Sequence, residues 1–254
     1  MAKIITVCNQ KGGTGKTTIA KQVALGLHGK RLLIDSDPQA NLTCQFIANP
    51  QGFNLADLYV LTKTRDVTID DVNKAIYDTN FDDLSIIPSH RNLVSFESDS
   101  SLGREKYLSI ILKFINNNYD YIIIDTPPSI GMLTINCLVA CTHTLIVTEP
   151  RKSSVDGVEQ MVKTLTLVKE NYNYNLDFLG IIVNKYSTTK DCNNWCSMLE
   201  DKYKDFVFKP FIKQRELLNK ANTSESNLIN SNKPLANDFN ELVNNLLTQI
   251  NIQE

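Results

Sequence analysis

A glycine-rich segment near the start of the chain has the composition of a phosphate-binding loop. It follows an apolar run at residues 4–7, precedes a helix-like segment, and reads Lys11, Gly12, Gly13, Thr14, Gly15, Lys16, Thr17, Thr18. Glycines let a backbone turn its N–H groups inward, and the positive end of the following helix attracts anions. We therefore expect these eight residues to bind a nucleotide, with the Lys16 amine on the β- and γ-phosphates and the Thr17 hydroxyl on Mg²⁺.

This segment departs from the usual motif G-x-x-x-x-G-K-[ST], whose first glycine would fall at Gln10. A second lysine, Lys11, stands directly before the glycines, where its side chain cannot easily fold back onto phosphates held by its own loop. We expect Lys11 to point outward and to compensate charge on a nucleotide held by a neighbouring subunit. An incidental glycine-rich turn is the weaker interpretation, because a strand and a helix flank the segment.

Acidic residues follow two further apolar runs. Asp35 and Asp37 come directly after residues 31–34, and Asp125 comes directly after residues 121–124. Ligands of open α/β sheets bind at the carboxyl ends of the strands. We expect Asp125 to hold the Mg²⁺ hydration shell, Asp35 to support the metal and Asp37 to orient the attacking water. A solvated turn at Asp35 and Asp37 is the alternative, and the neighbouring phosphate loop weakens it.

The elements that must position these residues alternate between strand-like and helix-like segments. Runs of β-branched and apolar residues predict strands at 4–7, 31–34, 84–87, 121–124, 144–147 and 179–183. Helix-length segments are predicted at 16–28, 42–59 (a short pair), 68–77, 103–117, 131–141, 153–172, 191–203 and 234–250. Because buried parallel strands are apolar on both faces, the pattern predicts a three-layer α/β fold with a mainly parallel, doubly wound sheet.

Three motifs together resemble the ParA/MinD family, the deviant Walker A branch of P-loop ATPases. They occur in the family's order and spacing, and they are the segment 11–18 described above, Asp35-Ser36-Asp37-Pro38-Gln39, and Asp125-Thr126-Pro127-Pro128-Ser129. Residues 131–140 also look like the family's helix after the Walker B strand. The resemblance covers about residues 2–185 and thins afterwards.

The resemblance implies a set of roles for these residues. In the family, the lysine equivalent to Lys11 reaches across a nucleotide sandwich dimer to the partner's phosphates, and the acid equivalent to Asp37 activates water. Asn184 would help to hold the adenine. The Asp-Pro-Gln sequence is more typical of ParA-type partition proteins than of MinD. A MgATP-bound homodimer that binds DNA without sequence preference, and that a ParB-like partner releases by stimulating hydrolysis, is therefore expected.

A DNA-binding surface is expected in the C-terminal third. Residues 185–220 contain eight basic and five acidic side chains. A dimer doubles this local excess and would present four basic residues on one face, where they would neutralise phosphates: Lys209, Lys213, Arg215 and Lys220. A solvated surface of mixed charge remains the alternative.

The length and overall composition of the chain limit the domain organisation and the binding partners that we expect. The chain has 254 residues and a net charge of -2, so we expect one domain with no overall attraction to polyanions. Residues 2–185 would form the nucleotide core and residues 186–254 would complete it. No apolar run is long enough to span a membrane, which favours a cytoplasmic, nucleoid-associated protein. Since the chain begins close to its first strand, we expect no N-terminal extension for operator binding.

Three rival functions remain to be weighed. A MinD-like membrane ATPase needs a basic amphipathic tail, but residues 221–254 carry one basic and four acidic side chains, so we expect the apolar stripe of residues 239–250 to pack on the body. An iron–sulfur reductase needs a second cysteine to accompany Cys137 before the Walker B strand, and none is there. We expect the six cysteines to be reduced thiols. A nucleotide-locked scaffold that positions another cargo stays open.

Overall fold

The core of the computed structural model is a seven-stranded sheet in the order β3-β4-β2-β5-β1-β6-β7. The structure describes residues 1–47, 52–64, 66–214 and 234–253. All neighbouring strands are parallel except β3 and β4, which pair antiparallel. The strands are β1 (Lys3–Cys8), β2 (Arg31–Asp35), β3 (Tyr77–Asp78), β4 (Leu84–Ile87), β5 (Tyr121–Asp125), β6 (His143–Thr148) and β7 (Asp177–Val183). The predicted mainly parallel, doubly wound sheet is confirmed.

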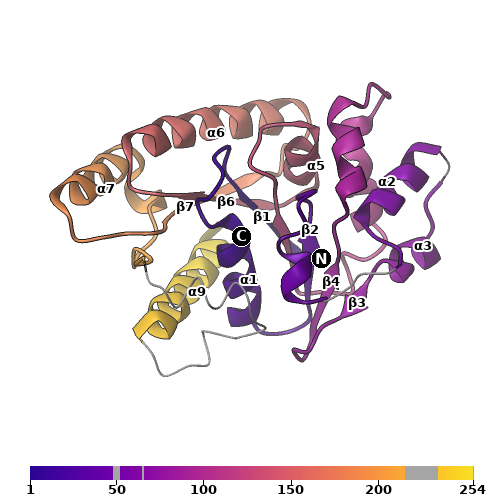
Figure 1. Ribbon diagram of the computed structural model, residues 1–254, viewed down its shortest axis with the longest axis horizontal. Helices are drawn as coiled ribbons and strands as arrows, with labels where there is room; N and C mark the ends of the chain where they lie inside the picture. The colour runs from indigo at the N-terminus through magenta and orange to yellow at the C-terminus, as the bar shows by residue number, and fades with distance from the viewer. Residues whose placement is uncertain (48–51, 65, 215–233, 254) are drawn as a thin grey trace.

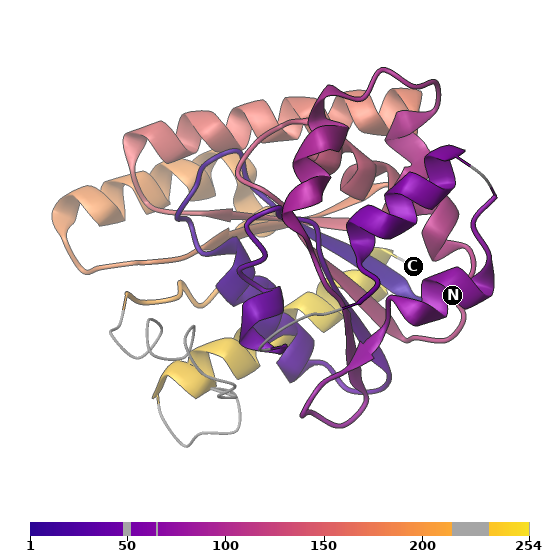
Figure 2. The ribbon, with the colours of Figure 1, turned by 45° about the vertical axis from the view of Figure 1, so that its right-hand side comes forward.

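Helices cover both faces of this sheet (Figures 1 and 2). One face carries α2 (Leu55–Thr64), α4 (Tyr107–Leu112), α5 (Met132–Ala140), α6 (Lys152–Asn171) and α7 (Lys190–Tyr203), and its buried side chains form one apolar cluster. The opposite face carries α1 (Lys16–Gly26) and α9 (Pro234–Gln253), which contribute to a second cluster. A short α3 (Ile69–Lys74) lies near the β3 edge. Four 3₁₀ segments complete the described elements: η1 (Thr43–Gln45), η2 (Arg91–Ser98), η3 (Arg104–Lys106) and η4 (Lys204–Phe206).

Two local predictions are wrong for identifiable reasons. The helix expected at residues 68–77 ends at Lys74, and Tyr77 instead pairs with Ile86 in the antiparallel edge strand β3. A strand of two residues carries too little alternation to be detected from sequence. The helix expected at residues 103–117 begins with η3 and its α-helical part ends at Leu112.

The N-terminal ends of two helices are capped in different ways. Thr68 caps α3 through a capping box, in which its hydroxyl accepts from the Asp71 N–H and Asp71 accepts from the Thr68 N–H. At α6, Arg151 occupies the N-cap position without a side-chain hydrogen bond. The helix begins at Lys152, so Ser153 lies inside its first turn and does not cap it.

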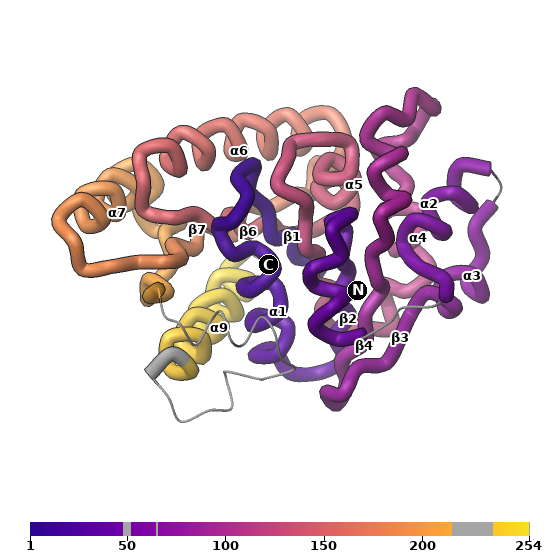
Figure 3. Tube along the Cα trace, in the orientation of Figure 1, coloured from indigo at the N-terminus to yellow at the C-terminus, as the bar shows by residue number. Residues whose placement is uncertain are grey.

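The C-terminal helix α9 packs on the body, as its apolar stripe predicts. The stripe residues are at most 3% exposed: Phe239, Leu242, Val243, Leu246 and Ile250. They join the cluster beneath the sheet, where α9 contacts α1 and β7 (Figure 3). The apolar face of α9 is therefore part of the core.

Candidate nucleotide-binding site

Three predicted site segments meet at one edge of the sheet because β5 lies between β1 and β2. Asp125 at the end of β5 is in register with Val7 of β1 and with Asp35 of β2. The glycine-rich loop begins at Lys11, four residues after Val7, so it lies beside both carboxylates. The carboxyl ends of parallel strands therefore bring the loop and the acids together.

The glycine-rich loop leads directly into α1. Gly13 and Gly15 have φ values of 77° and 94°, a left-handed conformation that glycine adopts without a steric penalty. Gly15 is the N-cap of α1 and makes no side-chain cap hydrogen bond, so the cap residue does not compete with an anion for the first helical N–H groups. The Lys16 amine donates to the carbonyl of Lys11 at 3.2 Å and therefore lies over the loop.

Replacing Gly15 with alanine should destabilise the protein because the new methyl group has no room. A Cβ at this position would lie 2.1 Å from Asn184 Nδ2, and the residue would also retain its left-handed φ. Strain and the displaced hydrogen bond together should lower the free energy of unfolding by about 2–4 kcal/mol. Urea titration would measure the loss.

Gly103 provides the matched control for this substitution. Its φ is 75° and a Cβ there would meet nothing within 4 Å, so Gly103→Ala should cost only the backbone strain, about 1 kcal/mol. Equal losses in the two variants would contradict the close approach of Asn184 to the loop.

Asp35 is held by the backbone that follows it. Its Oδ2 accepts from the N–H of Thr43 at 2.8 Å and from the Thr43 hydroxyl at 2.7 Å, and its Oδ1 accepts from the Asp37 N–H at 3.1 Å. Burial raises the pKa of Asp35 to about 6, against the effect of these hydrogen bonds. The contacts favour a role in shaping the 35–43 segment, and direct support of a metal by Asp35 stays a prediction.

The carboxylate of Asp125 is buried but, within the described chain, lacks hydrogen-bond partners. Neither of its carboxylate oxygens has a hydrogen-bond partner of good geometry among the described residues. Burial raises the pKa of Asp125 well above its usual value and the nearby charge of Asp35 adds to this, whereas the Thr17 hydroxyl and the Lys16 amine act in the opposite direction. An unpaired buried carboxylate is costly, and a divalent cation would relieve that cost. The arrangement of Asp125 and Thr17 therefore fits a Mg²⁺ site.

The positive charge of Lys16 offsets the negative charge of the acidic residues at this edge of the sheet. It is 6% exposed, and burial lowers its pKa while the charges of Asp125 and Asp37 oppose that shift. Asp37 itself is 8% exposed, and its Oδ1 accepts from the N–H of Gln39 at 2.9 Å. The structure thus brings Lys16, Asp37 and Asp125 together, as the sequence predicts.

Asn184 contacts the loop through its amide. The Nδ2 atom donates to the carbonyl of Thr14 at 2.8 Å, and the Oδ1 atom is buried without a partner among the described residues. A contact between Asn184 and an adenine ring stays a prediction, while its contact with the loop was not foreseen.

Three other residues that hold the loop were missed from the sequence. Asn9 donates to the carbonyl of Val147 at 2.6 Å and accepts from the N–H of Lys11 at 3.0 Å, which ties the loop to β6. Lys185 donates to the carbonyl of Gly13 and forms an ion pair with Glu149 at 2.6 Å. These residues belong to no short motif. What they share is their position, since each lies at or just after the carboxyl end of a parallel strand, at the edge of the sheet where the loop lies.

The predicted DNA-contacting residues are only partly described. The Lys209 amine forms an ion pair with Glu200 at 2.5 Å and lies 3.4 Å from the centre of the Phe211 ring, so its charge is partly balanced. Lys213 is exposed and, within the ranges described, forms no ion pair. Arg215 and Lys220 lie outside the described residues.

The cysteines do not form a metal centre within the described residues, where no group of three or more His, Cys, Asp or Glu side chains is placed to hold a metal ion. All six cysteines are free thiols, and all except Cys44 are buried. Cys137 is fully buried in the cluster above the sheet, where it packs among apolar side chains. None of the described helices is both long and apolar enough to cross a membrane.

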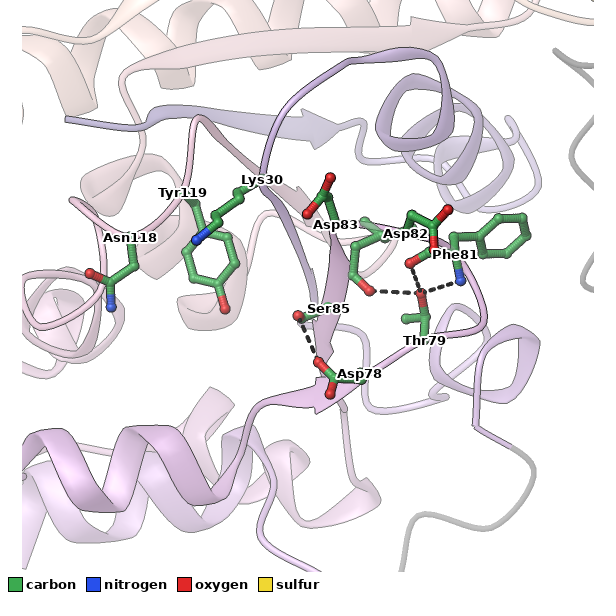
Figure 4. A pocket seen from close by; sticks show the side chains of 10 residues that line it. Lys30, Asp78, Thr79, Phe81, Asp82, Asp83, Ser85, Asn118 and Tyr119 are labelled. Carbon is green, nitrogen blue, oxygen red and sulfur yellow. Dashed lines mark hydrogen bonds between the residues drawn. The ribbon is translucent and has the colours of Figure 1, made fainter.

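A cavity of about 570 Å³ lies at the opposite edge of the sheet (Figure 4). It is formed where β2, β4 and β5 begin, and its walls include Lys30, Asp78, Asp83, Ser85 and Tyr119. Asp78 accepts a hydrogen bond from Ser85 at 3.4 Å. The cavity is separate from the loop, which follows the carboxyl end of β1.

Comparison with known proteins finds partition proteins among the matches. A family model described as an AAA domain matches residues 2–178. The sporulation initiation inhibitor protein Soj of Bacillus subtilis is 34% identical over 231 residues, which cover 87% of this chain and 88% of Soj. The chromosome partitioning protein ParA of Myxococcus xanthus is 31% identical over 195 residues, which cover 74% of this chain and 66% of that protein.

Solved structures of similar proteins have the same fold as this chain. A plasmid partition protein from Borrelia burgdorferi has a TM-score of 0.79 at 26% identity, covering 98% of this chain and 99% of that chain. Cobyrinic acid a,c-diamide synthase from Mycobacterium smegmatis, solved with an ATP analogue and magnesium, has a TM-score of 0.83 at 25% identity and covers 98% and 96% of the two chains.

Proposed function

We propose, since this chain belongs to the ParA/MinD family of P-loop ATPases, that it is a ParA-type partition ATPase that switches between states with bound nucleotide. The observation that carries the proposal is the phosphate loop with Lys16 and Asp125 beside it and with Lys11 at its start. The similarity to the chromosome partitioning protein ParA and to a plasmid partition protein favours partition among the functions of this family.

The cofactors are ATP and Mg²⁺, and the site residues fit both. The N–H groups of residues 12–18 would receive the phosphates, with the Lys16 amine adding a positive charge. The Thr17 hydroxyl and the unpaired oxygens of Asp125 would hold the metal. The bound metal would neutralise charge on the phosphate oxygens.

Hydrolysis of the terminal phosphate needs positioning and charge compensation more than covalent chemistry. Asp37 is nearly buried at the same edge as Lys16, where its carboxylate can orient a water toward the phosphate. Lys16 stabilises the negative charge that develops in the transition state. We expect this ATPase to turn over slowly until a ParB-like activator stimulates it.

Replacing Lys11 with alanine should abolish dimerisation with ATP while nucleotide binding persists. The Lys11 amine forms no ion pair within the described part of the chain, and its Cε would lie 3.7 Å from a Cβ at Gly157, so it runs along the start of α6. An unpaired amine at this position is available to a nucleotide held by a second copy. Light scattering after size exclusion, with ATP and Asp37→Ala in both proteins, would measure the change. A Lys11→Ala protein that dimerises fully would contradict the role across subunits.

The proposed dimer would bind DNA through the surface that includes Lys213. Lys209 is partly balanced by Glu200, so Lys213 is expected to contribute more than Lys209 to phosphate binding. Arg215 and Lys220 complete the proposed set. Binding through phosphates is independent of sequence and weakens as salt rises.

The decisive experiment measures binding of the purified full chain to random-sequence duplex DNA and, in parallel, to anionic liposomes. Each binding partner is tested with ATP, ADP and no nucleotide, and Asp37→Ala preserves the ATP state. DNA binding that requires ATP and weakens with salt supports the proposal. Liposome binding would favour a MinD-like ATPase, and binding to neither would favour a scaffold for a protein cargo, so either result contradicts the proposed partition function.

A further inference from the structure

Two side chains at the end of β7 hold two consecutive carbonyl groups of the phosphate loop. Asn184 Nδ2 donates to the carbonyl of Thr14 at 2.8 Å, and Lys185 Nζ donates to the carbonyl of Gly13. The two donors are 170 and 172 positions from their acceptors in the sequence. The fold therefore brings the end of the β7 strand directly onto the loop.

These two contacts also set the direction of two loop N–H groups. A trans peptide unit is planar, and its N–H points opposite to its C=O. The Gly13 carbonyl shares a unit with the Thr14 N–H, and the Thr14 carbonyl shares a unit with the Gly15 N–H. With both carbonyls held toward β7, both N–H groups point to the other side of the loop. Successive N–H groups with a common direction form the type of concavity that binds phosphate oxygens.

Lys185 adopts an unusual backbone conformation to make its contact. Its φ is 56°, in the left-handed region that residues with a Cβ rarely occupy. Such strain persists where the surroundings hold the residue in place, and it is concentrated at functional sites. Lys185 lies two residues after the end of β7, and its side chain contacts both the loop and Glu149.

Glu149 fixes the Lys185 amine from the end of β6. The Oε1 atom of Glu149 is 2.6 Å from Lys185 Nζ, and its Oε2 atom is 3.2 Å from Arg151 Nε. Glu149 is 8% exposed, so solvent screens this pair less than an ion pair at the surface. A carboxylate held in this way keeps the amine over the Gly13 carbonyl.

We propose that Lys185, held by Glu149, is a positioning residue that fixes the loop N–H groups of Thr14 and Gly15 in the orientation that binds phosphate. This inference rests on the proposed function, because it assumes that the loop binds a nucleotide. Orienting donors before a ligand arrives lowers the entropy that binding must remove, so the contact increases nucleotide affinity. Asn184 provides the second anchor, on the Thr14 carbonyl.

Two substitutions of Lys185 separate positioning from a merely structural role. Lys185→Met keeps an unbranched aliphatic side chain and removes the amine. Lys185→Gly removes the amine and also relieves the left-handed strain, since glycine adopts positive φ freely. If Lys185 positions the loop, both variants lose affinity, yet Lys185→Gly keeps an unfolding midpoint without nucleotide at or above that of the parent.

The experiment is isothermal titration of MgADP into the parent chain and its variants, with thermal unfolding of each protein without nucleotide. Lys185→Met and Lys185→Gly should each bind MgADP roughly tenfold more weakly, the effect of one hydrogen bond from a charged donor. Glu149→Gln should weaken binding less, and combining it with Lys185→Met should add little, because both changes disrupt one contact. Lys169→Met is the matched control, since Lys169 forms an exposed pair with Asp177 at the other end of β7, and it should bind like the parent.

Parental affinity in Lys185→Met would overturn the inference. A loss of affinity accompanied by a lower unfolding midpoint in both Lys185 variants would also overturn it, since the loss would then reflect a weakened fold. A parent chain that does not bind MgADP would overturn the proposed function and this inference with it. The two failures are thus distinguished by the parent protein alone.

Discussion

Replacing Lys16 with alanine should reduce the affinity for MgADP and MgATP by at least about 100-fold. The amine lies over the loop, where it donates to the Lys11 carbonyl at 3.2 Å. There it can form charge-assisted hydrogen bonds to two phosphates, each contributing about 1.5–3 kcal/mol. Since about 1.4 kcal/mol corresponds to a tenfold change, losing two such bonds predicts an effect of this size.

The same substitution should also change the balance of charge at the buried edge. The positive charge of Lys16 lowers the pKa of Asp125, so its removal should leave that carboxyl protonated over a wider pH range. Isothermal titration would measure affinity, and thermal unfolding would verify that the variant is folded. Lys169→Ala removes an exposed lysine and serves as the control. Nucleotide binding by folded Lys16→Ala at the parental affinity would refute the role assigned to the loop.

The sheet and its phosphate loop could be predicted because their signals are local and strong. Six apolar runs correspond to the six mutually parallel strands. The position of β5 between β1 and β2, which places Asp125 between the loop and Asp35, comes from the structure alone. The two-residue strand β3 could not be predicted, because its pairing with β4 depends on tertiary contact and not on its own pattern.

The residues that contact the loop from other parts of the chain could not be predicted from the sequence, for a different reason. Asn9, Asn184 and Lys185 act through backbone carbonyls, which have no sequence signature. The left-handed φ of Lys185 is likewise a tertiary property, because neither a glycine nor an asparagine marks the position. Side chains that contact phosphates are specified by motif, whereas side chains that orient the motif are specified by the fold.

Replacing Asp37 with alanine should preserve nucleotide binding and reduce ATP hydrolysis by at least about 100-fold, the smaller end of the usual effect of a positioned acid or base. The Asp37 carboxylate accepts from the Gln39 N–H at 2.9 Å, which fixes its direction at the end of β2. Its backbone N–H and carbonyl are held by Asp35 and Ser89, so the loop geometry should survive removal of the side chain.

Phosphate release in a single-turnover assay would measure this loss, because slow product release then cannot conceal a change in the chemical step. Isothermal titration with AMPPNP should give an affinity within about twofold of the parent. Asp177→Ala, which removes an exposed carboxylate at the far end of β7, should hydrolyse ATP at the parental rate. If Asp37→Ala hydrolyses ATP at the parental rate, a group other than Asp37 must orient the water. Loss of AMPPNP binding would instead mean that Asp37 supports the nucleotide itself, because the ground state and the transition state would then be weakened together.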